Sequence, residues 1–270
     1  MFPIIFFIIE SINDMHPIIA TKDYENKCLI IEMTDKSNSF TVPFLSALIQ
    51  ALELATDDKQ IHSVILTSKT NVFSVGGDLH DMKQEIETGN RSGYVDKIVP
   101  KINLIISKII GHQLPVICVL NGVAAGGGLS LALSCDYIFA KENTKLVPAF
   151  GTLALTPDSG SSIVLSEKLG YSLALKLIGT SDNITSNDAV KIGAIQAIGR
   201  TEDMMTEALR LAKKFGSADR WALSGTKKLL NQNLSYRLKE RLEAEYQSIH
   251  EASSREEFIS RLNSIIENLQ

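Results

Sequence analysis

The sequence is poor in the residues that build metal centres and disulfide frameworks. It has three cysteines, none of them in a CxxC pair, and all three lie within apolar runs. Its five histidines lie far apart and show no metal-ligand spacing. We therefore expect reduced core cysteines in a cytoplasmic protein, and no metal site. The cysteines are Cys28, Cys118 and Cys135, and the histidines are His16, His62, His80, His112 and His250.

An excess of basic charge is also missing. The formal net charge is −4 at pH 7, and lysine and arginine are scattered rather than gathered into a stripe. Such a distribution gives no reason to expect a nucleic acid as a partner. The composition is ordinary for a globular protein, with 44% hydrophobic and 21% charged residues. A chain of 270 residues is long enough for one large core or two small domains.

The sequence has no apolar run long enough to cross a membrane as a helix. Residues 1–9 are almost wholly apolar, but Glu10 and Asp14 follow and no basic residue precedes them. The run is too short for a bilayer, and it lacks the basic start and cleavage site of a signal peptide. Because Met15 opens a more conventional beginning, we treat residues 1–14 as an extension of unknown role outside the fold, and we expect no membrane partner.

From Ile18 onward, short β-branched runs alternate with longer amphipathic stretches, and after about residue 200 only helical patterns remain. This order predicts an α/β core over 15–199, followed by a helical region over 200–270. The expected hairpin strands are 18–21 and 28–31, the further strands are 63–67, 115–120, 136–140 and 194–198, and the helices of the core include 42–55 and 95–109.

Two glycine-rich turns are the chemically informative part of the sequence. They occupy 71–79 and 121–130, and each follows a buried strand and opens a helix. Such a turn presents unpaired backbone N–H groups beside a partially positive helix N-terminus, and glycine lets a ligand oxygen approach them. Two such turns that meet in space would form an oxyanion hole with two donors. Alternatively, each turn serves only tight bending and close helix packing. A dinucleotide loop does not fit, because Leu131 stands where its third glycine would be.

In order and separation, the two turns resemble the two signatures of the enoyl-CoA hydratase/isomerase (crotonase) family. Segment 73–79 (FSVGGDL) is similar to the first, and 121–128 (NGVAAGGG), followed by 134–136 (SCD), is similar to the second. The resemblance continues through 157–160 (PDSG) to Lys227 and runs from about Ile18 to the C-terminus. It implies an α/β fold, a spiral of ββα units with a C-terminal helical region that assembles trimers, often paired into hexamers.

The resemblance also implies the substrate and part of the site. The substrate would be an acyl thioester of coenzyme A or of a pantetheine carrier, so coenzyme A enters with the substrate and no separate cofactor is expected. The N–H groups of Gly77 and Gly127 would hold the thioester oxygen as it becomes an enolate. Asp78 is expected to cap the next helix. Segment 74–79 would line the coenzyme A groove, with Ser74, Val75, Gly76, Asp78 and Leu79 as its further members.

The carboxylates of the hydratases are missing. By resemblance, their two glutamates fall on Ser130 and Phe150, and neither a hydroxyl nor a phenyl ring can activate water and manage the C2 proton. We therefore expect negligible hydration. Asp158 follows Pro157, as an acid does in the Δ3,Δ2-enoyl-CoA isomerases and the isomerase of phenylacetate degradation. One carboxylate is enough to move a double bond, because it can take a proton from C2 and return it at C4.

Asp158 also has a structural interpretation. Segment 157–162 (PDSGSS) precedes an apolar helix, and an aspartate there can cap that helix. The lack of another acid near the thioester favours catalysis, for which an apolar wall, such as Phe150 and Leu155, would have to raise its pKa.

Three functions stay open: this isomerase, another crotonase-fold lyase or hydratase acting on CoA- or carrier-bound polyketide substrates, and a non-catalytic acyl-CoA-binding homologue. A pure scaffold gains nothing from an oxyanion hole, which argues against the last.

The helices after residue 200 are amphipathic and have no strands of their own to cover. Leu229, Leu230 and the apolar residues of 255–268 therefore need a partner surface. We expect a homotrimer or a dimer of trimers.

Overall fold

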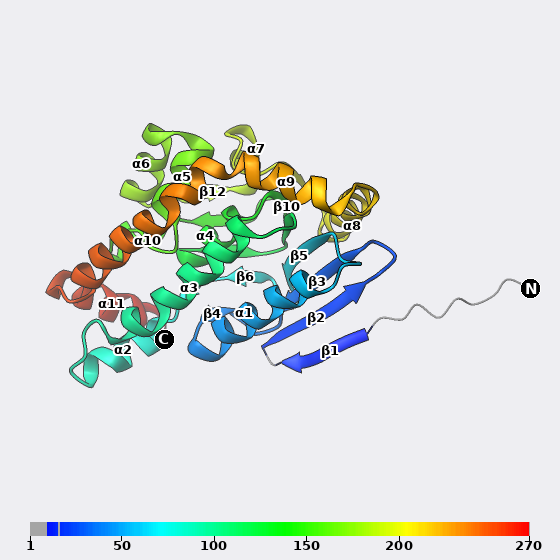
Figure 1. Cartoon of the computed structure of the whole chain (residues 1–270). Helices are drawn as coiled ribbons and strands as arrows, with labels where there is room; N and C mark the ends of the chain where they lie inside the picture. Colours follow the sequence, from blue (N-terminus) through cyan, green and yellow to red (C-terminus); the bar gives the residue numbers. More distant parts are fainter. Residues whose placement is uncertain (1–9, 16, 270) are drawn as a thin grey trace, which may run out of the picture.

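A seven-stranded sheet forms the backbone of the computed structural model, which describes residues 10–15 and 17–269 (Figure 1). The spatial order is β1-β2-β3-β5-β8-β10-β13, with the first three strands antiparallel and the rest parallel to β3. All six residues of β5 are buried, as expected of a strand covered on both faces. The bounds are β1 (Glu10–Met15), β2 (Ile18–Asp23), β3 (Cys28–Met33), β5 (Ser63–Ser68), β8 (Val116–Leu120), β10 (Tyr137–Lys141) and β13 (Ala197–Gly199).

Short strands beside the large sheet make the chain a spiral of ββα units. In successive units, β5, β8 and β10 join the large sheet, and the next strands, β6, β9 and β11, join a second sheet of order β12-β11-β9-β6. A helix then leads to the next unit. A further parallel pair, β4 with β7, brings Phe40 beside Gly77. The bounds are β4 (Ser39–Phe40), β6 (Val72–Ser74), β7 (Gly76–Gly77), β9 (Val123–Ala125), β11 (Lys145–Val147) and β12 (Ile184–Thr185).

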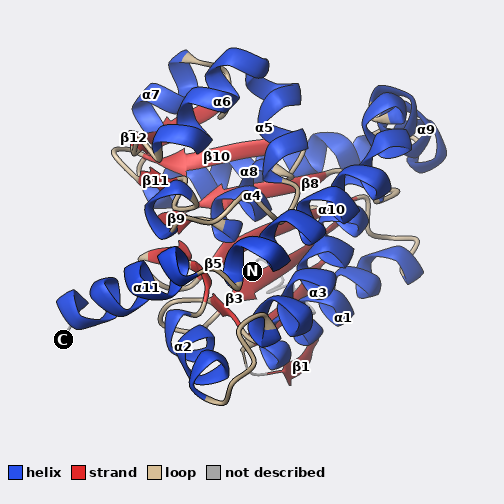
Figure 2. Ribbon diagram, turned by 90° about the vertical axis from the view of Figure 1, so that its left-hand side faces the viewer, coloured by secondary structure: helices blue, strands red, loops and turns tan. Residues whose placement is uncertain are grey.

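Helices cover both faces of the large sheet (Figure 2). The helix α8 packs Met204, Ala208 and Ala212 against residues of β3, β5, β8 and β10, while α1 and α3 belong to the main core on the other face. The helices of the core are α1 (Val42–Asp57), α2 (Leu79–Glu87), α3 (Gly93–Gly111), α4 (Gly127–Leu133), α5 (Ser161–Leu169), α6 (Tyr171–Thr180) and α7 (Ser186–Lys191), with a 3-10 turn at Gly151–Leu153. The later helices are α8 (Thr201–Ser217), α9 (Arg220–Leu230), α10 (Gln232–Ser253) and α11 (Glu256–Leu269).

The main elements expected from the sequence are confirmed, with two differences. The predicted strand at 194–198 begins only at Ala197, because the N–H groups of Ala194 and Ile195 still bond to Ala189 at the end of α7. At the other end of the chain, β1 pairs with β2, so the large sheet takes in part of the segment 1–14 that the sequence places outside the fold. No strand follows Gly199 as far as Leu269, and within the described residues no helix is long and apolar enough to cross a membrane.

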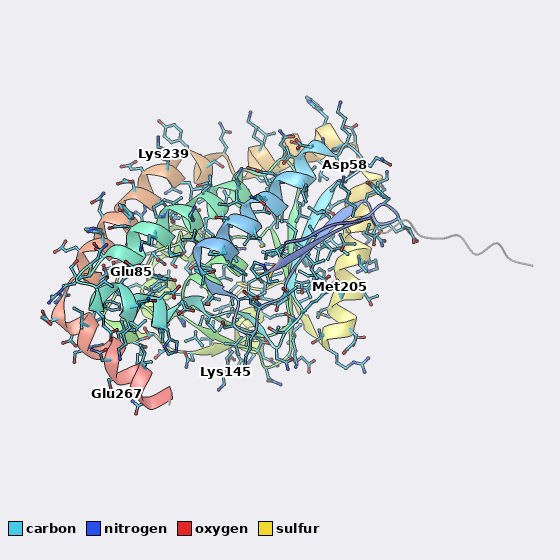
Figure 3. The ribbon with its side chains drawn as sticks, turned by 90° about the horizontal axis from the view of Figure 1, so that it is seen from below. Asp58, Glu85, Lys145, Met205, Lys239 and Glu267 are labelled. Atoms are coloured by element: carbon cyan, nitrogen blue, oxygen red, sulfur yellow. The ribbon has the colours of Figure 1, made fainter. Side chains whose placement is uncertain are left out.

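The expectation that α9 and α11 both need a partner surface is wrong for α11, and for α9 it stays a prediction. Leu229 and Leu230 are 73% and 82% exposed. In contrast, α11 folds back beside α2, at the end of the molecule marked by Glu85 and Glu267 in Figure 3. Its apolar residues are buried there against Leu79, Met82 and Leu153 of the same chain. These covered residues of α11 are Phe258, Leu262 and Ile266.

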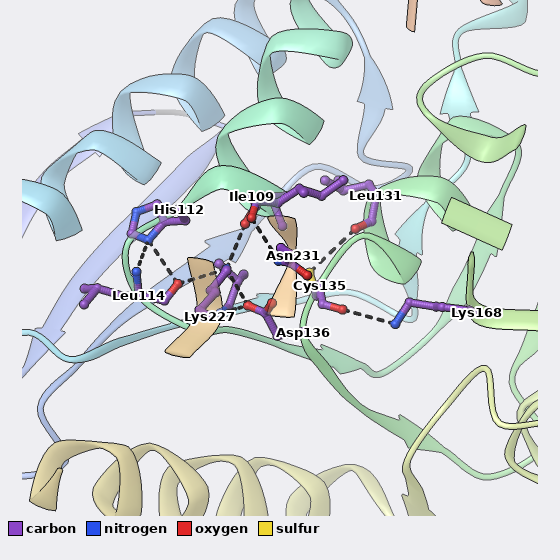
Figure 4. Close-up of polar contacts among 11 residues, drawn as sticks. Ile109, His112, Leu114, Leu131, Cys135, Asp136, Lys168, Lys227 and Asn231 are labelled. Atoms are coloured by element: carbon purple, nitrogen blue, oxygen red, sulfur yellow. Dashed lines mark hydrogen bonds and ion pairs between the residues drawn. The ribbon is translucent and has the colours of Figure 1, made fainter. Parts of the chain in front are cut away.

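A buried ion pair holds α9 to the core (Figure 4). The ammonium of Lys227 donates to the carbonyls of Ile109 and Leu114, at 2.9 and 3.1 Å, and to the carboxylate of Asp136 at 2.6 Å. The same carboxylate oxygen accepts from the N–H of Val116. Lys227 is 6% exposed, and it gives the carbonyls of Ile109, in α3, and Leu114, just before β8, a charged donor inside the protein.

We expect Lys227→Met to lower the free energy of unfolding by about 2–3 kcal/mol. The substitution removes the ammonium from two buried carbonyls, which keep only longer contacts with His112, and from a partly buried carboxylate, which keeps only the N–H of Val116. The methionine stem keeps most of the packing. Lys228→Met is the matched control, because Lys228 is exposed and should change stability by less than about 0.5 kcal/mol. Urea unfolding at one protein concentration measures both, and equal midpoints for the two variants would contradict the prediction.

Candidate active site

A cavity of about 670 Å³ is lined by the two glycine turns and by residues of α2, α3, α10 and α11. One part of its wall is polar and includes Gly77, Gly127 and Asp158. The remainder is largely apolar, and α11 contributes Phe258 and Ile265 to it. Its apolar lining also includes Phe40, Val95, Ile98, Val99, Phe150, Leu153, Leu155 and Ile249.

The two glycine turns touch each other. Gly76 has a φ of +75°, and a Cβ there would lie 2.7 Å from the carbonyl oxygen of Ala125 and 2.8 Å from the nitrogen of Gly127. Only glycine allows both that conformation and that approach. Gly127 is the first residue of α4, so its N–H has no partner within the helix. The spatial meeting of the turns, which an oxyanion hole requires, is therefore present.

Hydrogen bonds of two side chains, Tyr94 and Ser74, hold the first turn in place. The hydroxyl of Tyr94 accepts from the N–H of Asp78 at 2.7 Å and donates to the carbonyl of Phe40 at 2.6 Å. Burial raises the pKa of Tyr94, so this phenol stays protonated and remains a donor. The hydroxyl of Ser74 donates to the carbonyl of Asn38 and accepts from the N–H of Gly76. Because these bonds hold the N–H groups of Gly76 and Asp78, they fix the backbone on both sides of Gly77.

The predicted groove residues divide into lining and supporting ones. Val75, Asp78 and Leu79 line the cavity, whereas Ser74 and Gly76 are buried beneath it. Asp78 is the N-cap of α2, as expected: its carboxylate accepts from the N–H groups of His80 and Asp81 and from the hydroxyl of Ser39. This carboxylate is therefore already engaged.

Asp158 lines the cavity and does not cap the helix that follows. The N-terminus of α5 is held by Glu245 of α10, whose carboxylate accepts from the N–H groups of Gly160 and Ser162, both at 2.7 Å. The carboxyl of Asp158 accepts a bond from the hydroxyl of the neighbouring Ser159, at 2.9 Å. A Cβ on Gly127 would lie 2.9 Å from that hydroxyl oxygen, so the turn of Asp158 abuts the second glycine turn. The capping interpretation of Asp158 is wrong.

The surroundings of Asp158 raise its pKa from 3.8 to about 7. Burial is the largest cause, and Phe150 and Leu155, which line the same cavity, are part of its apolar wall. The negative charge of Glu245 acts in the same direction, and the bond from Ser159 opposes both. Near neutral pH, both protonation states of this carboxyl are populated, so it can accept a proton and return it.

The two positions where hydratases carry glutamates supply no charge. Ser130 is 1% exposed, bonds to the hydroxyl of Ser161 and the carbonyl of Gly126, and is not part of the cavity wall. Phe150 is in the wall as a phenyl ring. Among the described residues that line the cavity, the acids are Asp78 and Asp158, and Asp78 is the cap of α2.

Sequence reasoning missed Glu245, Tyr94 and the apolar residues of α11 as parts of the site. Glu245 carried a signal: it lies at helical spacing with Leu238, Leu242 and Ile249, so an acid occupies the buried face of α10. Tyr94 carried none, because its hydroxyl meets Phe40 and Asp78 only in the folded chain.

The spiral of ββα units and the paired glycine turns define a crotonase-type fold. The chain belongs to the enoyl-CoA hydratase/isomerase family, whose sequence model matches residues 23–270. The trans-2-decenoyl-[acyl-carrier-protein] isomerase of Streptococcus mutans is 24% identical over 208 residues, which are 76% of this chain and 79% of the relative. The 1,2-epoxyphenylacetyl-CoA isomerase of Escherichia coli K12 is 28% identical over 203 residues, 75% and 77% of the two chains.

Solved structures agree with this assignment. An enoyl-CoA hydratase from Bacillus halodurans superposes with a TM-score of 0.85 at 25% identity, over 92% of this chain and 99% of that one. The resemblance drawn from the glycine turns is thus confirmed at the level of the family, which includes both hydratases and isomerases.

We expect Asp158→Asn to stabilise the fold increasingly as the pH rises. Because the pKa of Asp158 is raised on folding, the stability that its neutral form contributes is complete below about pH 4 and is lost as the pH rises through about 7. Asparagine does not titrate and avoids that loss. Melting temperatures at pH 5, 6 and 8 measure the gain, which should grow toward pH 7 and then level off; a gain independent of pH would contradict the prediction.

Proposed function

We propose that the protein is a Δ3,Δ2-enoyl thioester isomerase in which Asp158 is the only acid and base. The observation that carries this proposal is the free position of Asp158: its carboxyl lines the cavity, caps no helix and has a pKa of about 7. Ser130 and Phe150 leave the site without the two carboxylates that hydration needs.

The reaction needs one proton acceptor and one oxyanion site. Asp158 takes the C2 proton of a 3-enoyl thioester, and the electron pair of that C–H bond forms the C1=C2 bond of a dienolate. The negative charge moves to the thioester oxygen, where the N–H groups of Gly77 and Gly127 stabilise it. Asp158 then returns the proton to C4, the C2=C3 bond forms and the carbonyl is restored. Each such N–H donor is worth about 3 kcal/mol in the transition state.

The apolar part of the cavity fits an acyl chain. Its wall between α3, α10 and α11 consists of aliphatic and aromatic side chains, which favour a hydrocarbon over a polar acyl group. Two isomerases among the relatives act, by their names, on an acyl-carrier-protein and a coenzyme A thioester. Either carrier presents the same pantetheine thioester to Gly77 and Gly127.

We expect the protein to convert 3-enoyl-CoA into 2-enoyl-CoA without gain of mass, and to hydrate 2-enoyl-CoA negligibly. Asp158→Asn should lower kcat by about 10²–10⁴-fold, because an amide cannot accept the C2 proton, while KM changes little. Mass spectrometry and the ultraviolet absorbance of the conjugated product identify the reaction.

The control is Asp81→Asn, which changes an acid of α2 that is not in the cavity wall and should keep wild-type turnover. Hydration at a rate comparable with isomerisation would contradict the proposal. Normal turnover by Asp158→Asn would remove Asp158 from the mechanism.

The proposal includes a homotrimer or a dimer of trimers built on α9. This helix exposes three large apolar side chains. Tyr236, which follows a few residues later in α10, is 90% exposed. A cluster of that kind is uncommon on a monomer and typical of an interface. The exposed residues of α9 are Trp221, Leu229 and Leu230.

We expect sedimentation to give three or six times the 29.6 kDa of one chain. Leu230→Asp should shift the protein toward monomer, because a charge in an apolar interface loses its hydration. Val42→Asp is the control: Val42 is 40% exposed at the start of α1, far along the chain from α9. A monomeric mass for the wild type at micromolar concentration would contradict this assembly.

A further inference from the structure

Glu245 is a buried acid without a surface role. It is 5% exposed, and both carboxylate oxygens are used: one accepts from the N–H of Gly160 and the other from the N–H of Ser162, at 2.7 Å each. Helix caps usually come from residues beside the helix. Here the cap of α5 comes from α10, 85 residues further along the chain.

The turn that Glu245 holds is the one that carries Asp158. Ser159 and Gly160 both have left-handed backbones, with φ of +54° and +75°. For Ser159 this conformation costs about 1 kcal/mol and persists only where the surroundings impose it. Glu245 binds the N–H at Gly160, and the fully buried Ser159 donates to the carboxyl of Asp158. A continuous chain of bonds therefore runs from α10 to the cavity.

The negative charge of Glu245 also raises the pKa of Asp158. Burial raises the pKa of Glu245, and the bonds from Ser162 and Gly160, together with the positive charge of Arg241 one turn earlier in α10, oppose that rise. Each carboxylate oxygen accepts from a backbone N–H group, and these bonds favour the ionised form. The charge of Asp158 is in turn one of those that raise the pKa of Tyr94 of α3, which stays neutral. Arg241 is exposed and bonds to the hydroxyl of Ser162, so solvent screens it.

We propose that Glu245 is a positioning residue for the proton transfer: it fixes the strained turn that presents Asp158 to the cavity, and its fixed negative charge makes the carboxylate of Asp158 a stronger proton acceptor. This inference rests on the proposed function in that Asp158 performs the transfer. Without Glu245, the turn loses its anchor at Gly160 and the base loses its neighbouring charge.

Glu245→Gln tests both parts. The glutamine oxygen can still accept from one N–H, but its NH₂ group faces the other, and the charge is gone. We expect kcat to fall about 10-fold with KM changed less than 2-fold, because small misplacements of a catalytic group cost rate rather than binding. We also expect the acidic limb of the kcat/KM profile to move to lower pH, since removal of a negative charge lowers the pKa of Asp158.

Two further variants separate charge from position. Glu240→Gln is the matched control, because Glu240 is an exposed acid of the same helix, and its kcat and pH profile should equal those of the wild type. Glu245→Asp keeps the charge but withdraws it by one methylene, so kcat should fall while the acidic limb stays near its wild-type position. If Glu245→Gln does not fold, a wild-type kcat in Glu245→Asp overturns the positioning role.

A direct titration distinguishes failure of this inference from failure of the proposed function. The infrared carbonyl band of protonated Asp158, assigned by its loss in Asp158→Asn, reports the titration without turnover. A wild type that isomerises, with the same Asp158 titration and the same kcat in Glu245→Gln, overturns the role of Glu245. A wild type that does not isomerise overturns the proposed function, and a titration that still shifts to lower pH then supports the influence of Glu245 on Asp158.

Discussion

The site depends on the contact between two backbone turns that come from different ββα units. Gly76 lies so close to Ala125 and Gly127 that no side chain fits between them. This contact fixes the positions of Gly77 and Gly127 in the cavity wall relative to each other, and the surrounding bonds of Tyr94 and Ser74 preserve it. The spiral fold provides the contact, because consecutive units place their second strands, β6 and β9, side by side.

Around this contact, the carboxylates differ in whether they bond to the N–H groups at the start of a helix. Asp78 and Glu245 each satisfy the start of a helix, at α2 and α5. Asp158 satisfies none and lies against apolar walls that weaken its acidity. A carboxylate thus has a different role according to the backbone donors within its reach, and the cap that α10 supplies to α5 leaves Asp158 without a capping role.

The sequence predicted the large elements and the glycine turns because both depend on local patterns. Buried runs such as 63–67 and the periodicity of 95–109 need no knowledge of distant partners. The cap of α5 was beyond such patterns: residues 157–162 look like a self-capped helix start, and only the folded chain brings Glu245 to it. The burial of Phe258 was missed for the same reason, since an amphipathic helix does not reveal whether its own chain or another covers it.

The contribution of α10 and α11 to the cavity has a consequence for the order in which the site forms during synthesis. The glycine turns and Asp158 are all made before residue 160, yet the anchor of the Asp158 turn is residue 245 and a wall of the cavity is residue 258. If the sheet folds before these helices, the cavity lacks that wall and the turn of Asp158 lacks its anchor. The candidate site is therefore complete only after residues 245 and 258 have folded onto it.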